Sequence, residues 1–328
     1  MSRRIAIIGA GIAGLTCAKA LTELGYTVNV FEKSKGVSGR ASTRRLPEGD
    51  CDHGAQYITA KTTEFKKVLD HWVSQGLIEL WEPRIEVFGA RQSGHQANED
   101  GVIKRYVGTP RMTAPANELA KSLCVKTATK VCGISQSPQG WLIFDDQQNL
   151  IDCVEIVIFA IPPAQIAHLL AQARPDWLNS LTQIEMLPCW TVMAQADNKT
   201  MPSFDAAFIN EGPLSWVANN ASKPGRMPTP LWTIQASHQW SIENLHKDQQ
   251  AVTSELVSSF ERLAQVKVIS TVTHRWLYAK SAKEDDRLYL WDDKLCLGAA
   301  GDWLSAGNIE GAWLSGKACA DGVRKSIA

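Results

Sequence analysis

Residues 5–15 read IAIIGAGIAGL and combine a short apolar run with three glycines in the pattern G-x-G-x-x-G. The apolar run predicts a buried strand, and the apolar positions that follow recur at helical spacing. In such a strand–turn–helix the glycines permit a tight turn, a close approach of pyrophosphate and close helix packing. The free N–H groups at the start of the helix then favour phosphate. The stretch predicts a nucleotide-binding turn whose contact residues are Gly9, Gly11, Ile12, Ala13 and Gly14.

The residues after this turn complete a strand–helix–strand unit. Gly25 ends the predicted helix, and Thr27 to Phe31 form a β-branched and aromatic run that predicts a second strand. Glu32 follows that strand, at the place where a carboxylate can bind both ribose hydroxyls of a dinucleotide. The unit therefore predicts a dinucleotide ligand, but it fits NAD as well as FAD.

A basic loop, residues 33–45, comes directly after Glu32. Its cations and backbone donors suit a second contact with a long diphosphate ligand, which makes Lys33, Gly39 and Arg40 candidates. The same composition is also typical of an exposed surface loop.

Composition and charge exclude several classes of partner. The 34 basic and 34 acidic residues cancel, so no overall field attracts nucleic acid or anionic lipid. Eight cysteines are scattered without a C-x-x-C pair, which is typical of reduced cytoplasmic thiols. The apolar run at Ile5 is too short and too rich in glycine for a signal peptide, and no run of about 18 apolar residues occurs. We expect a soluble cytoplasmic protein with a small-molecule partner.

The 328 residues exceed the usual size of one hydrophobic core, and the pattern of predicted strands and helices changes along the chain. Predicted strands are Val125–Val131, Gly140–Phe144, Ile151–Phe159 and Lys294–Leu297; predicted helices are Gln165–Ala173, Gln249–Ala264 and Ile309–Val323. Tryptophan-rich strands fill the middle of the chain. We predict a nucleotide-binding domain from residues 1–58, 106–163 and 292–328, interleaved with a substrate domain from residues 59–105 and 164–291.

Several segments together resemble the flavin-containing amine oxidase superfamily, from one end of the chain to the other. They are Gly9–Gly14, Glu32-Lys33, Gly36–Arg40, Asp52–Tyr57 and Gly301–Ala312. Residues 54–59, the chain length and the Gly301-Asp302 tail are most similar to the renalase family within it, in particular to its bacterial members. The resemblance implies an α/β fold: a Rossmann-like FAD-binding domain of the glutathione-reductase and amine-oxidase type, interleaved with a mixed-sheet α+β substrate domain.

The resemblance also implies roles for individual residues around a non-covalent FAD. It assigns the pyrophosphate to Gly9–Gly14, the adenosine ribose to Glu32 and the adenine to Val131. It assigns the phosphate or flavin side to Arg40, and the ribityl or pyrophosphate region to Asp302. The isoalloxazine edge is assigned to Gln56 and Tyr57, in the segment that also holds Gly54 and Ala55, and the flavin carbonyl end to the Ile309 backbone. Ser38 departs from the family pattern, because a second glycine is common there. A serine suits that turn only if its backbone is not left-handed.

No catalytic triad, P-loop or metal-ligand spacing is present in the sequence, so we expect no metal and no nucleophilic catalysis. Flavin chemistry needs mainly a well-placed donor. Pocket candidates are Tyr57, Trp216, Asn219, Asn220, Trp232, His238 and Trp276. Aromatic walls would suit a flat ring, although tryptophan in alternating strands more often packs a core.

The renalase resemblance implies oxidation of misreduced NAD(P)H isomers, in which the hydride sits at ring position 2 or 6, with electrons passing through FAD to O₂ and giving H₂O₂. The alternatives are a flavin amine oxidase acting on a primary or secondary amine and a non-catalytic flavin-binding sensor.

Overall fold

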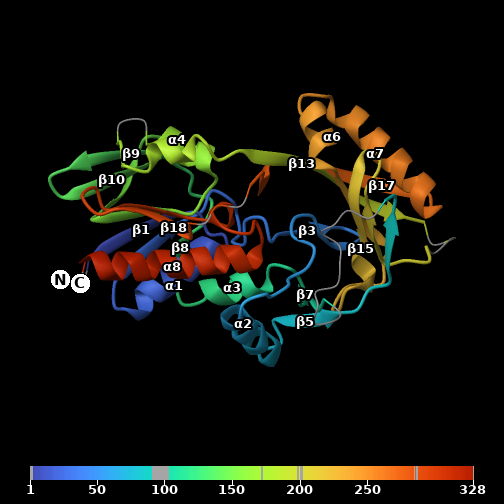
Figure 1. The fold of residues 1–328 in the computed structure, drawn as a ribbon, viewed down its shortest axis with the longest axis horizontal. Coiled ribbons are helices and arrows are strands. Elements are labelled where there is room, and N and C mark those ends of the chain that lie inside the picture. Colours follow the sequence, from blue (N-terminus) through green and yellow to red (C-terminus); the bar gives the residue numbers. More distant parts are fainter. Residues whose placement is uncertain are drawn as a thin grey trace.

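The computed structural model describes residues 3–90, 103–170, 173–197, 199, 202–283, 285 and 287–327. These residues form two lobes that lie side by side (Figure 1). The first lobe holds both ends of the chain and contains β1 (Arg4–Ile8), α1 (Ile12–Glu23) and α8 (Ile309–Ile327). The second lobe contains β13 (Met186–Ala196), β15 (Leu214–Asn219) and α7 (Gln249–Ala264). None of the described helices is long and apolar enough to cross a membrane.

A six-stranded, mostly parallel sheet is the centre of the first lobe. Its order is β18 (Tyr289–Asp292), β19 (Leu297–Ala300), β12 (Ile156–Phe159), β1, β2 (Thr27–Phe31) and β8 (Cys124–Lys126). β1 runs parallel to both β2 and β12, with Ile7 opposite Val30 and Ile158. The strand β1 is apolar throughout its inner part because both faces of this sheet are covered.

The two faces of the first sheet are covered by different elements. Ile5 and Ile7 pack toward α1, α8, α2 (Thr63–Ser74) and α3 (Ala114–Ala120). The alternate residues Ala6 and Ile8 pack on the other side, since successive strand side chains point to opposite faces. That side is covered by a three-stranded sheet and two short helices: β9 (Val131–Ser137), β10 (Gly140–Asp145), β11 (Leu150–Val154), α4 (Pro163–Leu169) and α5 (Leu178–Leu181).

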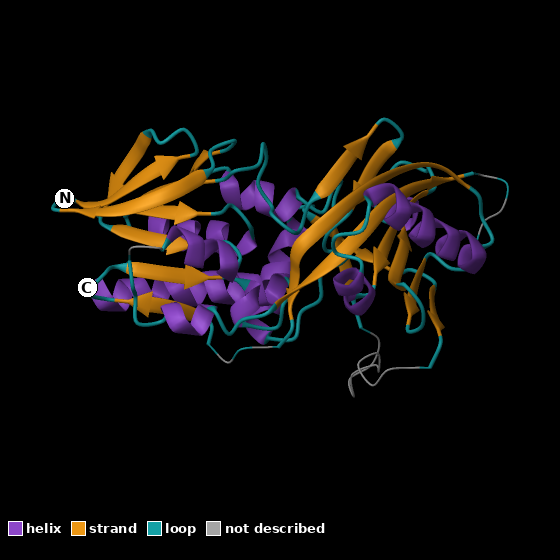
Figure 2. Cartoon of the chain, turned by 90° about the horizontal axis from the view of Figure 1, so that it is seen from above, coloured by secondary structure: helices purple, strands orange, loops and turns teal. Residues whose placement is uncertain are grey.

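The second lobe is built on a mixed sheet in the order β17 (Val268–Ser281), β13, β16 (Leu231–Ala236), β15, β14 (Ala206–Ile209) and β6 (Ile85–Phe88). One face packs against α7, where Val192, Ile234 and Phe260 form the core, and α6 (His238–Glu243) contacts β13. Figure 2 shows helix α7 lying along the strands of this sheet. The opposite face packs against two ribbons, β3 (Thr43–Leu46) with β4 (Gly49–Asp52) and β5 (Ile78–Trp81) with β7 (Arg105–Gly108). Short 3₁₀ turns, η1 (Asn220–Ser222) and η2 (Asp302–Leu304), complete the structure.

The predicted fold class is confirmed, whereas three predicted strands need correction. Val125–Val131 is not one strand: β8 ends at Lys126, and Ala128 and Thr129 donate backbone hydrogen bonds to Ser34 and Glu32 before β9 begins. Ile151–Phe159 divides into β11 and β12 in different sheets, because the N–H of Glu155 bonds the carbonyl of Arg4.

The third correction concerns Lys294–Leu297. The strand β19 begins only at Leu297, since the Asp292 carboxylate accepts from the Leu295 N–H and closes a turn after β18. Among the predicted helices, Gln249–Ala264 is confirmed as α7. Gln165–Ala173 is shorter, as α4 ends at Leu169, and residues 171–172 lie outside the described residues.

Packing bears on the predicted division into domains. Helix α2 lies in the segment assigned to the substrate domain, yet its Phe65, Leu69 and Trp72 belong to the same core cluster as β1. The division remains a prediction, and α2 packs with the first lobe.

The contact between α1 and α8 leaves no room for side chains. A Cβ added at Gly316 would lie 2.2 Å from the carbonyl oxygen of Ala13. The backbone of α1 would have to move to relieve so short a contact, and this displacement is unfavourable in a close-packed core. The absence of a side chain at Gly316 therefore determines how closely the two helices approach. The nucleotide-binding turn at the start of α1 is thereby held by the C-terminal helix.

We expect Gly316→Ala to lower the free energy of unfolding by about 1–3 kcal/mol, because overpacking outweighs the gain in helix propensity. Denaturant unfolding measures the change. The matched control is Gly133→Ala, whose Cβ would meet only the Phe144 Cβ at 3.9 Å. Equal stabilities for the two variants would contradict the close helix contact.

Candidate functional site

The turn between β1 and α1 presents backbone donors to open space. Gly9 has a φ of +107°, and an added Cβ would lie 2.5 Å from the Ala160 carbonyl oxygen. A Cβ at Gly14 would lie 2.1 Å from the carbonyl oxygen of Gly9. A Cβ at Gly11, by contrast, would meet no atom within 4 Å, and no side chain caps the helix that follows. The first turn of α1 therefore faces a free volume with its positive end.

Glu32 closes one side of this turn. Its buried carboxylate accepts from the N–H of Ala10 at 2.9 Å and from the N–H of Ser34 at 2.8 Å. These two bonds fix the carboxylate beside the glycine turn, and each oxygen retains a lone pair for a hydroxyl. This is the arrangement expected of a ribose-binding acid.

The basic loop closes the other side. The N–H of Ser38 donates to the Ala10 carbonyl at 2.9 Å, and a Cβ at Gly39 would lie 3.3 Å from the Gly11 Cα. Arg40 forms an ion pair with Asp302 of η2 and donates to the Ala279 carbonyl at 3.2 Å. Ser38 is left-handed, with φ of +104°, and its hydroxyl donates to the Ala41 carbonyl. The serine thus occupies the strained turn that a glycine would adopt freely.

The start of α8 is fastened to the same region. Ile309 begins the helix, and the carboxylate of Glu310 accepts from the N–H groups of Lys61 and Thr62 at 2.9 and 2.7 Å. The N–H of Gly301 donates to Ser315 Oγ at 2.8 Å. Residues from the C-terminal helix are therefore bonded to segments near residues 61 and 301.

These residues fit FAD. The open volume at Gly11, the uncapped helix start and the fixed Glu32 carboxylate suit a pyrophosphate and a ribose. Val131, assigned to the adenine, is buried beside Ile8 and Phe31 in the core next to this turn. Lys33 is exposed at the rim.

Residues 52–57 lie against the buried face of the second sheet that is opposite α7. The Ala55 N–H donates to the Arg40 carbonyl at 2.9 Å. On the sheet side, Thr233 Oγ1 donates to the Asp52 carbonyl at 2.6 Å and Gln235 Nε2 to the Gly54 carbonyl at 2.9 Å. The segment that holds Gln56 and Tyr57 is thus fixed from both sides.

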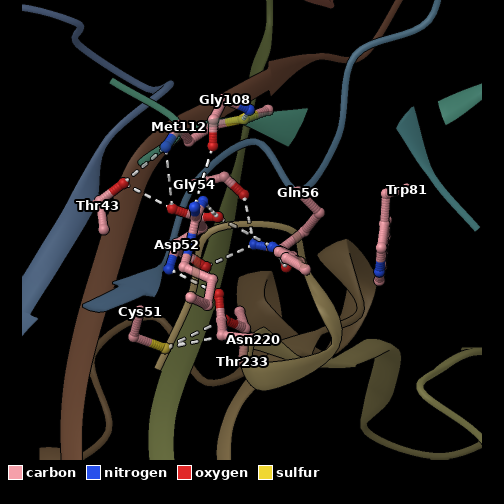
Figure 3. A network of polar contacts seen from close by, with 12 residues as sticks. Thr43, Cys51, Asp52, Gly54, Gln56, Trp81, Gly108, Met112, Asn220 and Thr233 are labelled. Carbon is pink, nitrogen blue, oxygen red and sulfur yellow. Dashed lines mark hydrogen bonds and ion pairs between the residues drawn. The ribbon is translucent and has the colours of Figure 1, made fainter. Parts of the chain in front are cut away.

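Asp52 is the centre of a buried ionic network (Figure 3). Its Oδ2 contacts Lys223 Nζ at 3.1 Å and Arg226 Nη2 at 2.7 Å, and all three side chains are at most 1% exposed. Thr43 Oγ1 and the Met112 N–H donate to Oδ1 at 2.6 and 3.3 Å. Burial acts to raise the pKa of Asp52, but the charges of Lys223 and Arg226 outweigh it and hold the pKa at about 2. Asp52 is therefore a permanent anion in the folded protein.

An aromatic cluster lies beside this network. The Tyr57 ring lies 5.6 Å from the Trp216 ring and 6.4 Å from the Trp81 ring, between centroids. Arg105 Cζ lies 5.3 Å from the Tyr57 centroid, and Lys223 Nζ lies 5.5 Å from the Trp81 centroid. Within the described chain, Arg105 Nε and Trp216 Nε1 are buried donors without a hydrogen-bond partner.

His53 belongs to a second ring cluster. Its ring stacks on Trp276 with centroids 5.2 Å apart, and His274 meets both rings edge-on. Trp276 Nε1 donates to the His53 carbonyl at 2.9 Å. Burial, with the nearby charges of His274 and Arg44, lowers the pKa of His53 to about 4. The ring is neutral at physiological pH.

The remaining pocket candidates separate. Trp232 lies on the other face of the sheet, in contact with Phe204 and Phe260, and we no longer place it in the pocket. His238 bonds the Pro188 carbonyl at 2.9 Å at the start of α6, away from Tyr57. Asn219 caps η1, and Asn220 Oδ1 accepts from the Asp52 N–H at 2.9 Å. Both asparagines therefore support the site through the backbone.

Sequence reasoning missed the cations Arg105, Lys223 and Arg226. Lys223 and Arg226 flank the Pro224-Gly225 pair, which begins four residues after Asn220, and that basic turn was the available signal.

The fold and the cofactor cradle, which consists of the Gly9–Gly14 turn, Glu32 and Arg40, together define a dinucleotide-binding protein. Residues 7–72 match the model of the NAD(P)-binding Rossmann-like domain, and residues 93–324 match that of the flavin containing amine oxidoreductases. The second match covers well over half of the chain. The chain belongs to the flavin-containing amine oxidoreductase family, and FAD is its cofactor.

Curated relatives share limited parts of the chain. The flavin-dependent L-tryptophan oxidase RebO of Lentzea aerocolonigenes is 29% identical over an alignment of 129 residues, and the match covers 31% of this chain and 27% of the relative. An L-amino-acid oxidase of Siganus canaliculatus is 37% identical over 67 residues, 20% of this chain and 13% of the relative. The chain thus spans less than a third of the length of these relatives.

Solved structures are similar over the whole chain. A redesigned putrescine oxidase has a TM-score of 0.73 at 13% identity, and the match covers 99% of both chains. At this identity the likeness shows the fold alone.

We expect Gly11→Val to fold but to lose FAD. The added side chain has open space in the protein, since no atom lies within 4 Å of its Cβ, whereas it would occupy the phosphate position. Affinity for FAD should fall at least about 100-fold, measured by flavin fluorescence titration of the apoprotein. Gly133→Val serves as the control. A yellow Gly11→Val protein with parental affinity would place the phosphates elsewhere.

Stability should fall as the pH drops from about 6.5 to about 4. The folded state holds His53 neutral down to a pKa of about 4, whereas the unfolded chain takes up a proton near its ordinary pKa of 6.5. The loss is at most about 3 kcal/mol. Denaturant unfolding at several pH values should show a smaller slope for His53→Gln than for His71→Gln, which removes an exposed imidazole. Equal slopes would refute the assignment to His53.

Proposed function

We propose that the protein oxidises misreduced NAD(P)H isomers, 2- or 6-dihydro-NAD(P), to NAD(P)⁺. The dihydropyridine ring loses a hydride, which is two electrons and one proton, and O₂ takes up these two electrons, this proton and one further proton from solvent to become H₂O₂. FAD, when bound, supplies the two-electron chemistry between donor and O₂. The proposal is supported by the charge around Tyr57 and by the sequence resemblance to the renalase family.

The charge around Tyr57 is the observation that carries the proposal. Arg105 lies over the Tyr57 ring, Lys223 lies over the neighbouring Trp81 ring, and Arg226 shares the Asp52 carboxylate with Lys223 in the adjoining buried network. Such a surplus attracts an anionic donor such as a dinucleotide, and it repels the ammonium group of an amine.

The ring geometry supports the same choice. The ring centroids of Tyr57 and Trp216 lie 5.6 Å apart, and the ring planes are tilted by 60° relative to each other. The two rings therefore do not form parallel walls with a gap for an aliphatic amine. Arg105 Nε and Trp216 Nε1, which have no hydrogen-bond partner among the described residues, would suit acceptor oxygens of a carboxamide or phosphate.

The proposed reaction asks little of the protein beyond placement. The lone pair on the ring nitrogen drives departure of the hydride and aromaticity is regained, so no general base is required. The chain's own residues would bind and orient the donor and exclude water. Turnover should therefore depend only weakly on pH across the neutral range.

The main alternative is an oxidase of amines or amino acids. The names of the similar proteins favour it, since they include an L-tryptophan oxidase and a putrescine oxidase. Such a substrate would place its ammonium group against the cationic surplus described above. A flavin-binding sensor is the second alternative.

Anaerobic mixing of the FAD-bound protein with candidate donors separates these functions. We expect 2- or 6-dihydro-NAD(P) to bleach the flavin absorbance rapidly, 4-dihydro-NADH slowly, and polyamines or L-tryptophan negligibly. Admission of O₂ should restore the absorbance and release H₂O₂. Arg105→Gln should raise the KM for the dihydropyridine about tenfold with a smaller effect on kcat, because it removes a charge from the donor side.

Rapid bleaching by an amine or amino acid, with the dihydropyridine isomers inert, would establish the amine-oxidase alternative instead. Inertness toward every donor, with FAD bound, would identify a sensor.

A further inference from the structure

The buried network around Asp52 carries an unbalanced charge. Lys223 and Arg226 contribute two positive charges and Asp52 one negative charge, and both cations contact the same oxygen, Oδ2. Cys51 adds no charge, because burial raises the pKa of its thiol to about 12. Within the described chain, no other acidic side chain contacts either cation. One positive charge is therefore left over in the interior.

A structural role accounts for Arg226 better than for Lys223. Arg226 pairs with Asp52 and also donates to the carbonyls of Gly108 and Pro110, so it ties the turn after η1 to the loop after β7. Lys223 adds a second cation to a carboxylate that is already paired. Burial lowers the pKa of Lys223, because removing an ammonium group from water is unfavourable. An unbalanced buried charge opposes folding unless an anion comes near.

The surplus charge lies next to the segment that meets the cofactor cradle. Lys223 Nζ donates to Gln56 Oε1 at 3.3 Å, and Gln56 Nε2 donates to the carbonyls of Asp52 and Gly54 at 2.7 and 3.1 Å. Gly54 adjoins Ala55, whose N–H bonds the Arg40 carbonyl at 2.9 Å. The ammonium group is thus one side chain away from the segment that closes on Arg40.

We propose that Lys223 stabilises negative charge on the FAD: the surplus of the Asp52–Lys223–Arg226 cluster favours the anion that FAD becomes when it takes up two electrons and one proton. The same charge favours the anionic adduct of FAD with sulfite, which forms by addition and needs no further reactant. The proposal rests on FAD binding and not on the identity of the donor. Lys223 acts here through space, beside Gln56, rather than on the reacting atoms of a substrate.

The test compares the two-electron midpoint potential and the sulfite affinity of FAD-bound variants. Lys223→Met removes the surplus charge, so sulfite should bind about tenfold more weakly and the midpoint potential should fall by about 30 mV, which is tenfold for a two-electron couple. Lys223→Arg keeps the charge, so its sulfite affinity should lie within about threefold of the parent and its midpoint potential within about 15 mV. Thr43→Val removes a hydrogen bond from Asp52 without changing the charge, and it should leave both values near those of the parent.

A second variant keeps the test decisive if Lys223→Met does not hold FAD. Gln56→Glu cancels the surplus by adding a negative charge beside Lys223, and it retains an acceptor for the ammonium group. It should weaken sulfite binding and lower the potential in the same direction. Parental values in FAD-bound Gln56→Glu or Lys223→Met would overturn the proposal, as would an equal fall in Thr43→Val. No pyridine nucleotide is used, so the result does not depend on the proposed reaction.

Discussion

The close passage of Gly54 beside the Arg40 backbone holds the two lobes in register. A Cβ at Gly54 would lie 1.9 Å from the Arg40 carbonyl oxygen, and the neighbouring Ala55 N–H donates to that same oxygen. On one side Arg40 is paired with Asp302 beneath the glycine turn, and on the other side Gly54 is bonded to Gln235 of the second sheet. The cofactor cradle and the aromatic cluster therefore keep a fixed relation to each other.

Several residues around this contact have a backbone conformation, a buried charge or an unpaired buried donor that is unfavourable in a folded protein. Ser38 takes a left-handed backbone that suits glycine, Lys223 is buried as a cation, and Trp216 buries an N–H without a partner within the described chain. Each departure opposes folding when taken alone. Their concentration around residues 38–57 is what a binding site produces, because groups arranged for a ligand are not arranged for the empty protein.

The parts of the site that were predicted from sequence are those in which neighbouring residues act together. The glycine turn and Glu32 belong to one strand–helix–strand unit, so their separation in the sequence determines how they lie relative to each other. Asp52 and Lys223 are brought together only by the tertiary fold. Trp216 and Trp232 look alike in the sequence, and only the register of β15 and β16 shows that they face opposite sides of one sheet. The break after Lys126 escaped prediction for a related reason, since it depends on hydrogen bonds to Ser34 and Glu32.

The first sheet places β19 beside β12 and α8 against α1, although these pairs are far apart in sequence. A ribosome delivers β1, α1 and β2 first, and the conformational entropy of closing so long a loop must be overcome before the late strand can join them. While the chain is still being synthesised, the glycine turn lacks Asp302 and the helix that packs on its base. The nucleotide-binding turn is therefore complete only after the last strand and the last helix of the chain have been made.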